Sequence, residues 1–231
     1  MVDYMHQVVK MVNLAQDRPL NEIVYEGLRS AIIKGVIPVG ERINEKTYAQ
    51  HLNISRTPIR NAISRFQGEG IVEYIPNQGV VIKRVTVKNA IEIYQLRIAL
   101  DTLASIEAMR LMTPQNYQEM QSLLERTEAA EAAKNVEQVI AYFSDFNNMI
   151  YQMSQMPILT LLIQRLRDYL ARFRDISLYD NRRRRMALDE HWLIYRCLKS
   201  KDEEQLSMLI KEHLLYSEQF VLQEVQKEEE A

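Results

Sequence analysis

The sequence predicts a mainly α-helical protein in which an N-terminal winged helix-turn-helix precedes an all-α antiparallel bundle of about six helices. Three observations support this fold class. Apolar residues recur at helical spacing along most of the chain. Glycine and proline number only six each among 231 residues, which disfavours a turn-rich β protein. Two short apolar runs, 71–75 and 80–83, flank the turn sequence Pro76-Asn77-Gln78-Gly79, as in a β-hairpin.

Length and charge distribution favour more than one domain. A chain of 231 residues exceeds the commonest domain size. Residues 1–85 contain 11 Lys and Arg against 8 Asp and Glu, whereas the remainder contains 18 against 23. We therefore divide the chain into an N-terminal arm (1–19), a winged helix-turn-helix domain (20–84) and an all-helical domain (86–227).

Composition also bears on cellular location. Cys197 is the only cysteine, so no internal disulfide can form, as expected in a reducing cytosol. No apolar run approaches the ~18 residues that a membrane-spanning helix needs. Asp3, His6 and Lys10 interrupt any signal-peptide pattern at the N-terminus. We expect a cytoplasmic protein without a membrane partner.

The arm and the first two helices come next. Residues 1–19 show no clean periodicity and are predicted to be weakly structured or accessory. A helix is predicted from Leu20 to Lys34, ended by Gly35, with a buried face of Ile23, Leu28, Ala31 and Ile32. After a turn-bearing connector at 35–40, Asn44 is predicted to cap a short helix that buries Tyr48, Ala49 and Leu52.

The third helix follows a tight turn at Asn53-Ile54. Ser55 is predicted to cap it, and Pro58 falls in its first turn, where a missing N–H leaves no hydrogen bond unmade. The spacing i, i+3, i+4, i+7 predicts its buried face, which is Ile59, Ala62, Ile63 and Phe66. With the hairpin, the three helices form a winged helix-turn-helix.

The outer face of the third helix indicates nucleic-acid binding. It carries Arg56, Thr57, Arg60, Asn61 and Ser64, and residues 46–68 include no acidic residue. An arginine offers two parallel donors that match O6 and N7 of guanine, and a helix N-terminus attracts phosphate. We predict that the helix enters the major groove of DNA through Ser55, Arg56, Thr57 and Arg60. The alternative is a winged helix used only for protein contacts.

Secondary DNA contacts are predicted outside this helix, from Arg42 and from the wing tip Asn77, Gln78 and Gly79. Other interpretations stay open, because Arg42 fits a surface residue and the wing residues fit turn formers.

Residues from Thr86 onward are predicted to be helical, with breaks near 113–114, 135, 156–157, 179–181 and 200–202. Such short connections make successive helices antiparallel. The run Arg182-Arg183-Arg184-Arg185 is interpreted as a solvated helix start or a dimer surface, with DNA contact as the alternative.

Several motifs resemble those of a known family. Glu41-Arg42-Ile43, Ser55–Arg60 (SRTPIR), Gly70-Ile71-Val72 and Pro76–Gly79 have the spacing of the DNA-binding domain of GntR-type regulators, in particular the FadR/VanR branch. Tyr94–Asp101 resembles the first helix of the branch's FCD effector domain, and Glu190-His191 and His213-Leu214 match two further motifs. The resemblance covers nearly all of the chain after residue 19.

The resemblance implies a sequence-specific transcription regulator, by family habit a repressor, that binds a palindromic DNA operator as a homodimer. It implies that the matching arginines contact DNA and that the wing glycine enters the minor groove. It also implies that residues 86–227 bind a small-molecule effector and dimerise.

Many FCD domains, by the same resemblance, bind a divalent metal through an Asp-x-x-x-His pair and two later histidines. This chain keeps His191 and His213, but Asn147 replaces the third histidine and Phe143 replaces the carboxylate. Asp145 lies on another face of the helix. Imidazole and carboxylate suit Zn, Ni or Mn, but two imidazoles and an amide make a poor site for Zn, which usually takes at least three strong protein ligands, so we expect no certain cofactor and a metal that is absent or weakly bound.

Four residues are predicted to face inward in the bundle: Arg97, Asn147, His191 and His213. Core histidines satisfied by hydrogen bonds, and an i,i+4 pair of Arg97 with Asp101, would explain them without a ligand. Our working hypothesis is a polar cavity in which these four residues hold an organic or sugar acid.

An enzyme is not expected, because no nucleophile elbow, phosphate-binding glycine loop or complete metal triad occurs. The alternative is a metal-dependent regulator or hydrolase that uses His191 and His213.

Overall fold

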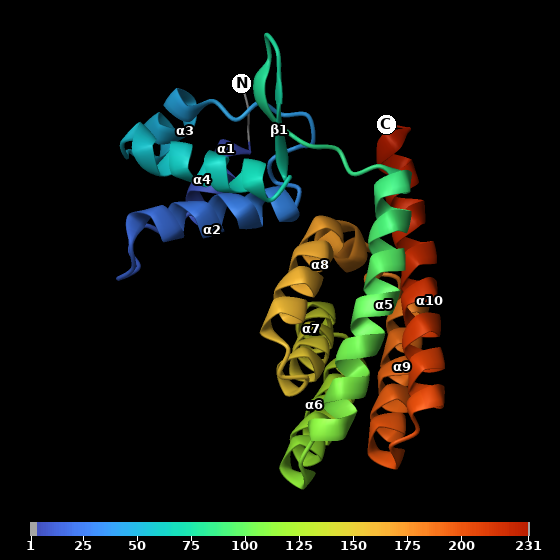
Figure 1. Ribbon diagram of the computed structural model, residues 1–231. Helices are drawn as coiled ribbons and strands as arrows, with labels where there is room; N and C mark the ends of the chain where they lie inside the picture. Colours follow the sequence, from blue (N-terminus) through green and yellow to red (C-terminus); the bar gives the residue numbers. More distant parts are fainter. Residues whose placement is uncertain (1–3, 231) are drawn as a thin grey trace. The chain divides into compact units, whose positions relative to one another are not determined.

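The computed structural model describes residues 4–230 of a chain that divides into two compact units, Met1–Arg84 and Val85–Ala231. The first unit contains α1 (Met5–Met11), α2 (Leu20–Ile33), α3 (Glu45–Leu52), α4 (Arg56–Gly68), β1 (Val72–Ile75) and β2 (Gly79–Ile82) (Figure 1). The second contains α5 (Val87–Leu111), α6 (Pro114–Ala132), α7 (Val136–Met153), α8 (Pro157–Ser177), α9 (Asn181–Ser200) and α10 (Glu203–Glu229).

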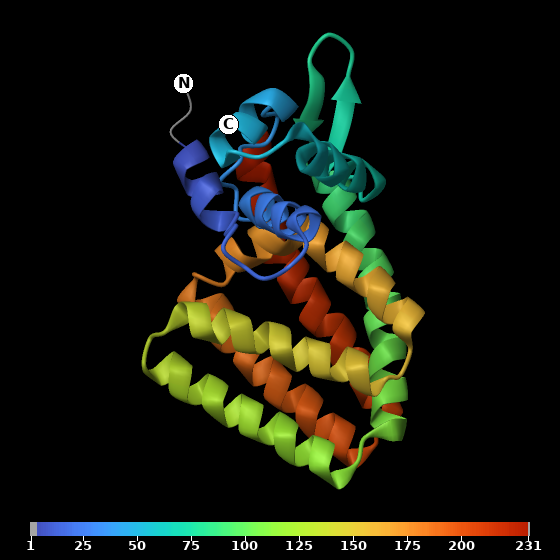
Figure 2. The same ribbon diagram turned by 90° about the vertical axis from the view of Figure 1, so that its left-hand side faces the viewer.

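The first unit confirms the predicted winged helix-turn-helix. The apolar faces predicted for α2 and α4 are buried, and the rings of Tyr25 and Phe66 stack between these helices with centroids 5.3 Å apart. β1 and β2 pair antiparallel, from Val72 opposite Ile82 to Ile75 opposite Gly79. Figure 2 shows this hairpin projecting beyond the three helices.

The weakly structured arm expected at residues 1–19 is wrong for its middle part, whereas residues 1–3 lie outside the described residues. Residues 5–11 form α1, which buries Met5 and Val8 in the core of the first unit. Val12, just after α1, lies so close to α2 that a Cβ on Gly27 would stand 2.7 Å from its Cγ2 atom. The glycine therefore permits this close packing.

The second unit confirms the predicted helical bundle, with six helices in the described part of the chain. Every predicted break is a helix boundary. Thr86 and Thr113 form capping boxes, and Asn135, Asp180 and Asp202 accept N-cap hydrogen bonds. The long helices α5 and α10 run side by side in opposite directions (Figure 1).

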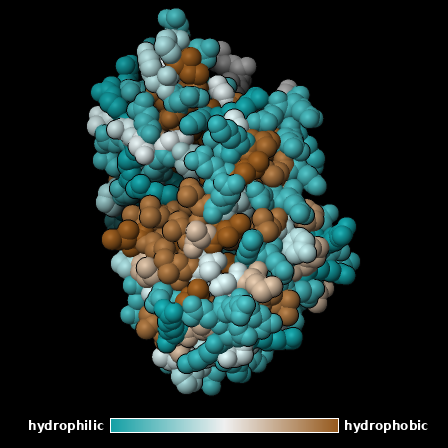
Figure 3. All heavy atoms as spheres, turned by 45° about the vertical axis from the view of Figure 1, so that its right-hand side comes forward, coloured by the Kyte–Doolittle hydropathy of each residue, from teal (hydrophilic) through white to brown (hydrophobic). Residues whose placement is uncertain are grey.

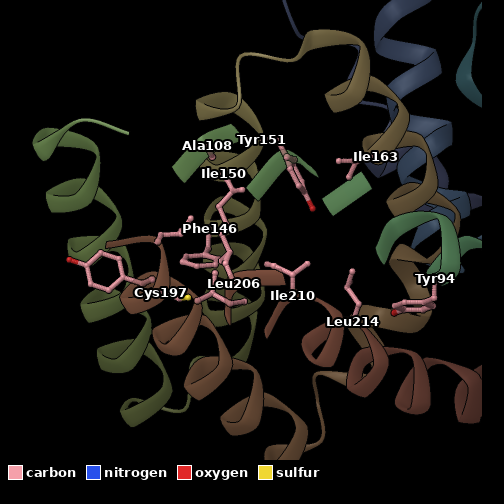
Figure 4. Packing of buried hydrophobic residues seen from close by; sticks show 14 of the residues in the cluster. Tyr94, Ala108, Phe146, Ile150, Tyr151, Ile163, Cys197, Leu206, Ile210 and Leu214 are labelled. Atoms are coloured by element: carbon pink, nitrogen blue, oxygen red, sulfur yellow. The ribbon is translucent and has the colours of Figure 1, made fainter. Parts of the chain in front are cut away.

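An apolar core fills the bundle. Figure 4 shows side chains from α5, α7, α8, α9 and α10 that converge in its interior, among them Tyr94, Phe146, Ile163, Cys197 and Leu214. Tyr94, although buried, keeps a hydrogen bond between its hydroxyl and Ser217 Oγ at 2.8 Å. The buried core thus contains paired polar groups.

The surface is mostly polar, but apolar side chains gather in one patch in the view of Figure 3. Large exposed apolar residues of the bundle include Leu96 and Leu103 on α5 and Ile158, Leu161 and Leu162 on α8. Within residues 4–230, no helix has both the length and the apolarity needed to span a bilayer.

Candidate DNA-reading face and effector cavity

The turn between α3 and α4 sets the geometry of the predicted recognition helix. Asn44 caps α3 by accepting hydrogen bonds from Lys46 N (3.0 Å) and Thr47 N (3.2 Å). Asn53 ends α3 in the left-handed conformation, with φ of 53°. Ser55 occupies the N-cap position of α4, but its side chain makes no capping hydrogen bond, so the predicted cap is wrong in this respect. The exposed Ser55 hydroxyl is therefore available to an external acceptor or donor.

The solvent-facing side of α4 is polar. Its predicted contact residues Arg56, Thr57 and Arg60 are exposed, as are Asn61 and Ser64, whereas the four predicted core residues are buried. We call Ser55, Arg56, Thr57 and Arg60 the DNA-reading face. Lys46, Asn53, Ser55 and Arg56 also line an open concavity at the start of α4. Cations beside a helix N-terminus suit a polyanion.

Arg60 has a partner that the sequence analysis did not consider. Its Nη2 atom lies 2.9 Å from Oε2 of Glu45, and its Nε atom lies 3.2 Å from Oε1. Glu45 is the first residue of α3, so the pair joins the two helices.

Arg42 lies beside the wing tip. It forms an isolated bridge with Val81, and a Cβ on Gly79 would stand 3.3 Å from its Nε atom. A hydrogen bond from Gln78 N to Ile75 O closes a turn with Asn77 at φ of 67°, and Gly79 has φ of 87°. Asn77 and Gly79 are therefore turn formers by conformation. Of the four secondary candidates, Arg42, Asn77 and Gln78 are exposed and Gly79 is half-buried, and Arg42 is the one cation among them.

In the bundle, the four predicted effector residues line one cavity. Its volume is about 40 Å³. Besides Arg97, Asn147, His191 and His213, the wall includes three arginines that the sequence analysis did not select as ligands: Arg167, Arg174 and Arg183. We call this space the bundle cavity.

The run Arg182–Arg185 is not simply a solvated helix start, because two of its members are buried. Arg183 is 2% and Arg184 is 6% exposed. Arg183 lies one and two helical turns before Ala187 and His191, on the buried face of α9. Arg184 instead pairs with Glu131 and donates to the carbonyl oxygens of Leu178 and Tyr179. The spacing of Arg183 with His191 was the signal that could have placed it in the cavity.

The helical spacing of Arg167 and Arg174 also indicates burial, and this signal was not used in the sequence analysis. They lie seven residues apart on α8, in phase with the buried residues Ile163 and Leu170. An arginine in a buried phase is rare unless its charge is paired. This spacing can be seen in the sequence alone, and it indicates that Arg167 and Arg174 belong to an internal polar site.

His191 is the most buried polar group of the cavity. It is 1% exposed, and both ring nitrogens lack a hydrogen-bond partner in the described part of the chain. Burial, followed by the nearby His213, Arg183 and Arg167, lowers its pKa well below the ordinary value. His191 is thus a neutral imidazole that offers one donor and one acceptor.

Two ionic clusters include residues of the cavity wall. Glu190 Oε2 accepts from His213 Nδ1 at 2.6 Å and from Arg183 Nη1 at 3.1 Å. In the second cluster, Asp101 pairs with Arg97 at 3.2 Å and accepts a hydrogen bond from Tyr151. Burial and then Asp101 raise the pKa of Tyr151, which keeps its hydroxyl protonated as the donor.

The charges around the cavity do not balance. Three of its four arginines pair with a carboxylate: Arg97 with Asp101, Arg174 with Asp175 and Arg183 with Glu190. The fourth, Arg167, is 5% exposed, and its bonded partner is the Asn148 amide oxygen at 2.9 Å. A buried cation that forms no ion pair among the described residues is unfavourable, so the cavity has the electrostatics of an anion site.

The same residues do not fit the metal site that the resemblance implies. No group of three or more His, Cys, Asp or Glu side chains that could hold a metal ion occurs among residues 4–230. The Phe143 ring packs edge-on against His191 with centroids 4.8 Å apart, where a carboxylate ligand would be needed. Asn147 donates its amide hydrogen to Phe143 O. The adjacent arginines also repel a divalent cation.

Comparison with known proteins identifies the families of both domains. The family description "Bacterial regulatory proteins, gntR family" matches residues 20–82, and "FCD domain" matches residues 92–216. The chain belongs to the GntR family. It is a DNA-binding transcription regulator with an FCD effector domain, and its relatives are regulators rather than enzymes, so the hydrolase alternative is wrong.

Individual GntR relatives match to different extents. The transcriptional regulator McbR of Escherichia coli is 31% identical over 62% of this chain and 65% of McbR, so the match spans just under two thirds of that relative. YdhC of Bacillus subtilis is 27% identical over 83% of this chain and 84% of YdhC. The gluconate operon transcriptional repressor of Bacillus subtilis is 29% identical over 45% of this chain and 42% of the repressor.

The solved structure of Escherichia coli McbR/YncC is similar to this chain, with a TM-score of 0.73 and 25% identity. The match covers 89% of this chain and 98% of the other. As a GntR regulator, this chain binds operator DNA through its winged helix and a small-molecule effector through its FCD domain.

Proposed function

We propose that this GntR regulator is a repressor that binds a palindromic operator as a homodimer and responds to a small organic acid in the bundle cavity. The charge imbalance at Arg167 carries the proposal of an acid, because a carboxylate would supply the missing counter-ion. Asn147, His191 and His213 line the same space and offer hydrogen-bonding groups.

The cavity volume limits the ligand. A cavity needs a volume of roughly 10–15 Å³ to hold one water molecule. A volume of about 40 Å³ thus suits a carboxylate with few further atoms. A sugar acid is larger than this cavity, so its binding would require the helices to move apart. A ligand that binds only this opened arrangement would shift the population of the protein toward the opened arrangement. The name of the related gluconate operon repressor supports repression.

The proposed dimer follows from the family and from exposed apolar side chains. Winged helices on a palindrome need two-fold symmetry, so that each half-site meets the same face. Ile158, Leu161 and Leu162 on α8 and Leu96 and Leu103 on α5 supply apolar area that a second copy could cover.

Thermal unfolding with formate, acetate, lactate and gluconate tests the ligand class. At about 100 times its Kd, a bound acid stabilises by about 2.7 kcal/mol, which raises Tm by several degrees. Arg167→Gln should abolish the shift, whereas Arg165→Gln, an exposed change on the same helix, should preserve it. The active acid should also change operator affinity in a gel shift. No Tm shift with any of these acids would refute the proposed ligand class.

A further inference from the structure

We propose that Glu45 is a specificity-determining residue, which fixes the guanidinium plane of Arg60 so that its free edge selects guanine. The inference rests on the proposed base contact of Arg60. Glu45 itself is a positioning residue, because it acts through Arg60.

The contact is a side-on ion pair between two helices. Glu45 Oε2 lies 2.9 Å from Nη2 and 3.3 Å from Nε of Arg60, and Oε1 lies 3.2 Å from Nε. The side chain of Arg60 is 66% exposed and that of Glu45 is 33% exposed. The arginine therefore remains open to solvent on the side away from the carboxylate.

The donors of Arg60 divide between two partners. A guanidinium has five N–H donors in a fixed plane. Glu45 uses Nε–H and the Nη2 hydrogen next to it. The two parallel hydrogens at the end of the group, one on Nη1 and one on Nη2, have no partner among residues 4–230. This end is the edge that matches guanine O6 and N7.

The position of Glu45 in the first turn of α3 favours its charged form next to Arg60. Glu45 follows the capping residue Asn44 and opens α3, where a negative charge is favoured by the helix dipole. An arginine that is ordered before binding loses less side-chain entropy when it meets a base. Its neutralised charge also adds little attraction for phosphates at random sequences, so the pair favours selectivity over general affinity.

Arg56 and Arg65 provide contrasts on the same helix. Arg56 lies one turn earlier on the same face and has no ion pair in the part of the chain that the structure describes. Arg65 pairs with Glu22 at 2.8 Å, with side chains 42% and 43% exposed, and lies outside the DNA-reading face. Glu22→Gln removes the same charge and a similar exposed pair, and is therefore a matched control.

The test starts from a random-sequence duplex library, from which the wild-type protein selects a consensus palindrome. Kd is then measured on this palindrome and on every symmetric single-pair change for wild type, Glu45→Gln, Glu45→Asp, Glu22→Gln, Arg60→Ala and Arg60→Ala/Glu45→Gln. Melting curves confirm that each variant is folded.

We expect Glu45→Gln to reduce discrimination about tenfold at a single G·C pair of each half-site. Glu45→Asp should lose it too, because its carboxylate is one methylene shorter although the charge remains. Glu22→Gln should match the wild type, and the double variant should match Arg60→Ala. Full discrimination in Glu45→Gln, or an equal loss in Glu22→Gln, would overturn the role of Glu45 while leaving Arg60 intact. Unchanged discrimination in Arg60→Ala would overturn the base contact and with it the inference.

Discussion

The imidazole of His191 stacks on the ring of Phe146, with centroids 4.3 Å apart and planes inclined by 16°. Phe143 packs against a different side of the same imidazole. Two aromatic rings thus hold a histidine whose nitrogens have no partner among the described residues. This arrangement favours the neutral ring and leaves its polar edge for a bound molecule.

Acid should destabilise the protein through His191. Burial and then the neighbouring cations lower its folded pKa, whereas the unfolded histidine titrates near 6.5. Below pH 6.5 the unfolded state binds a proton that the folded state excludes, so stability falls by up to about 1.4 kcal/mol per pH unit. Urea unfolding at several pH values should show this slope in the wild type and in His51→Gln, an exposed control, and a smaller slope in His191→Leu. An identical slope in His191→Leu would assign the acid sensitivity to other groups.

Asp101→Asn should destabilise the bundle strongly. The change leaves Arg97 buried without its carboxylate and weakens the acceptor of Tyr151. Removing one partner of a buried ion pair costs about 3–5 kcal/mol. Glu107→Gln, which breaks the exposed pair with Arg110, should cost about 1 kcal/mol or less. Denaturant unfolding measures both, and equal losses would show that burial does not matter here.

Gly27→Ala should destabilise the first unit, because the new Cβ would lie within 3 Å of both Val12 Cγ2 and Val12 Cα. Overpacking of this kind costs about 1–3 kcal/mol. Gly68→Ala is the control, since nothing lies within 4 Å of its Cβ position at the end of α4. It should be neutral or stabilise by up to about 1 kcal/mol. Equal unfolding free energies for the two variants would contradict the packing of Val12 on Gly27.

Much of this fold follows from the sequence because periodicity and caps act locally. The buried faces of α2 and α4, the hairpin and the breaks between α5 and α10 all depend on residues within a few positions of one another. Helix α1 could not be predicted in the same way. Its short run is stabilised by contacts of Met5, Val8 and Val12 with distant residues, and these require Gly27 to be small.

In the bundle cavity, too, some residues could be placed from the sequence and others could not. Arg97, Asn147, His191 and His213 could be placed inward by phase alone. The arginine run that begins at Arg182 resembles a solvated stretch in sequence, and its burial depends on Glu131 and Glu190, which are supplied by α6 and α9. The pair of Arg184 with Glu131 joins two helices, so spacing along the sequence does not encode it, whereas Arg183 and Glu190 lie seven residues apart on α9.

Gly79→Ala should weaken DNA binding as well as the wing. The substitution meets a positive φ of 87° and crowds Arg42, whose Nε would lie 3.3 Å from the new Cβ. Gly40→Ala has the same conformational strain, with φ of 77°, but nothing lies within 4 Å. Both should lose about 1 kcal/mol of stability. Only Gly79→Ala should lower operator affinity in a gel shift, and equal operator affinities would argue against a DNA contact at the wing tip.

The proposed regulator must bind DNA sequence-selectively through α4. The most direct measurement is the ratio of Kd for a random duplex to Kd for the selected palindrome, in wild type, Arg60→Ala and Arg65→Ala. Arg65 is the control because it lies on the same helix but pairs with Glu22, away from the DNA-reading face. A lost bidentate base contact costs about 1–3 kcal/mol at each half-site, so Arg60→Ala should lower the ratio by at least about tenfold while Arg65→Ala keeps it at the wild-type value. A wild-type ratio in Arg60→Ala would contradict the central claim.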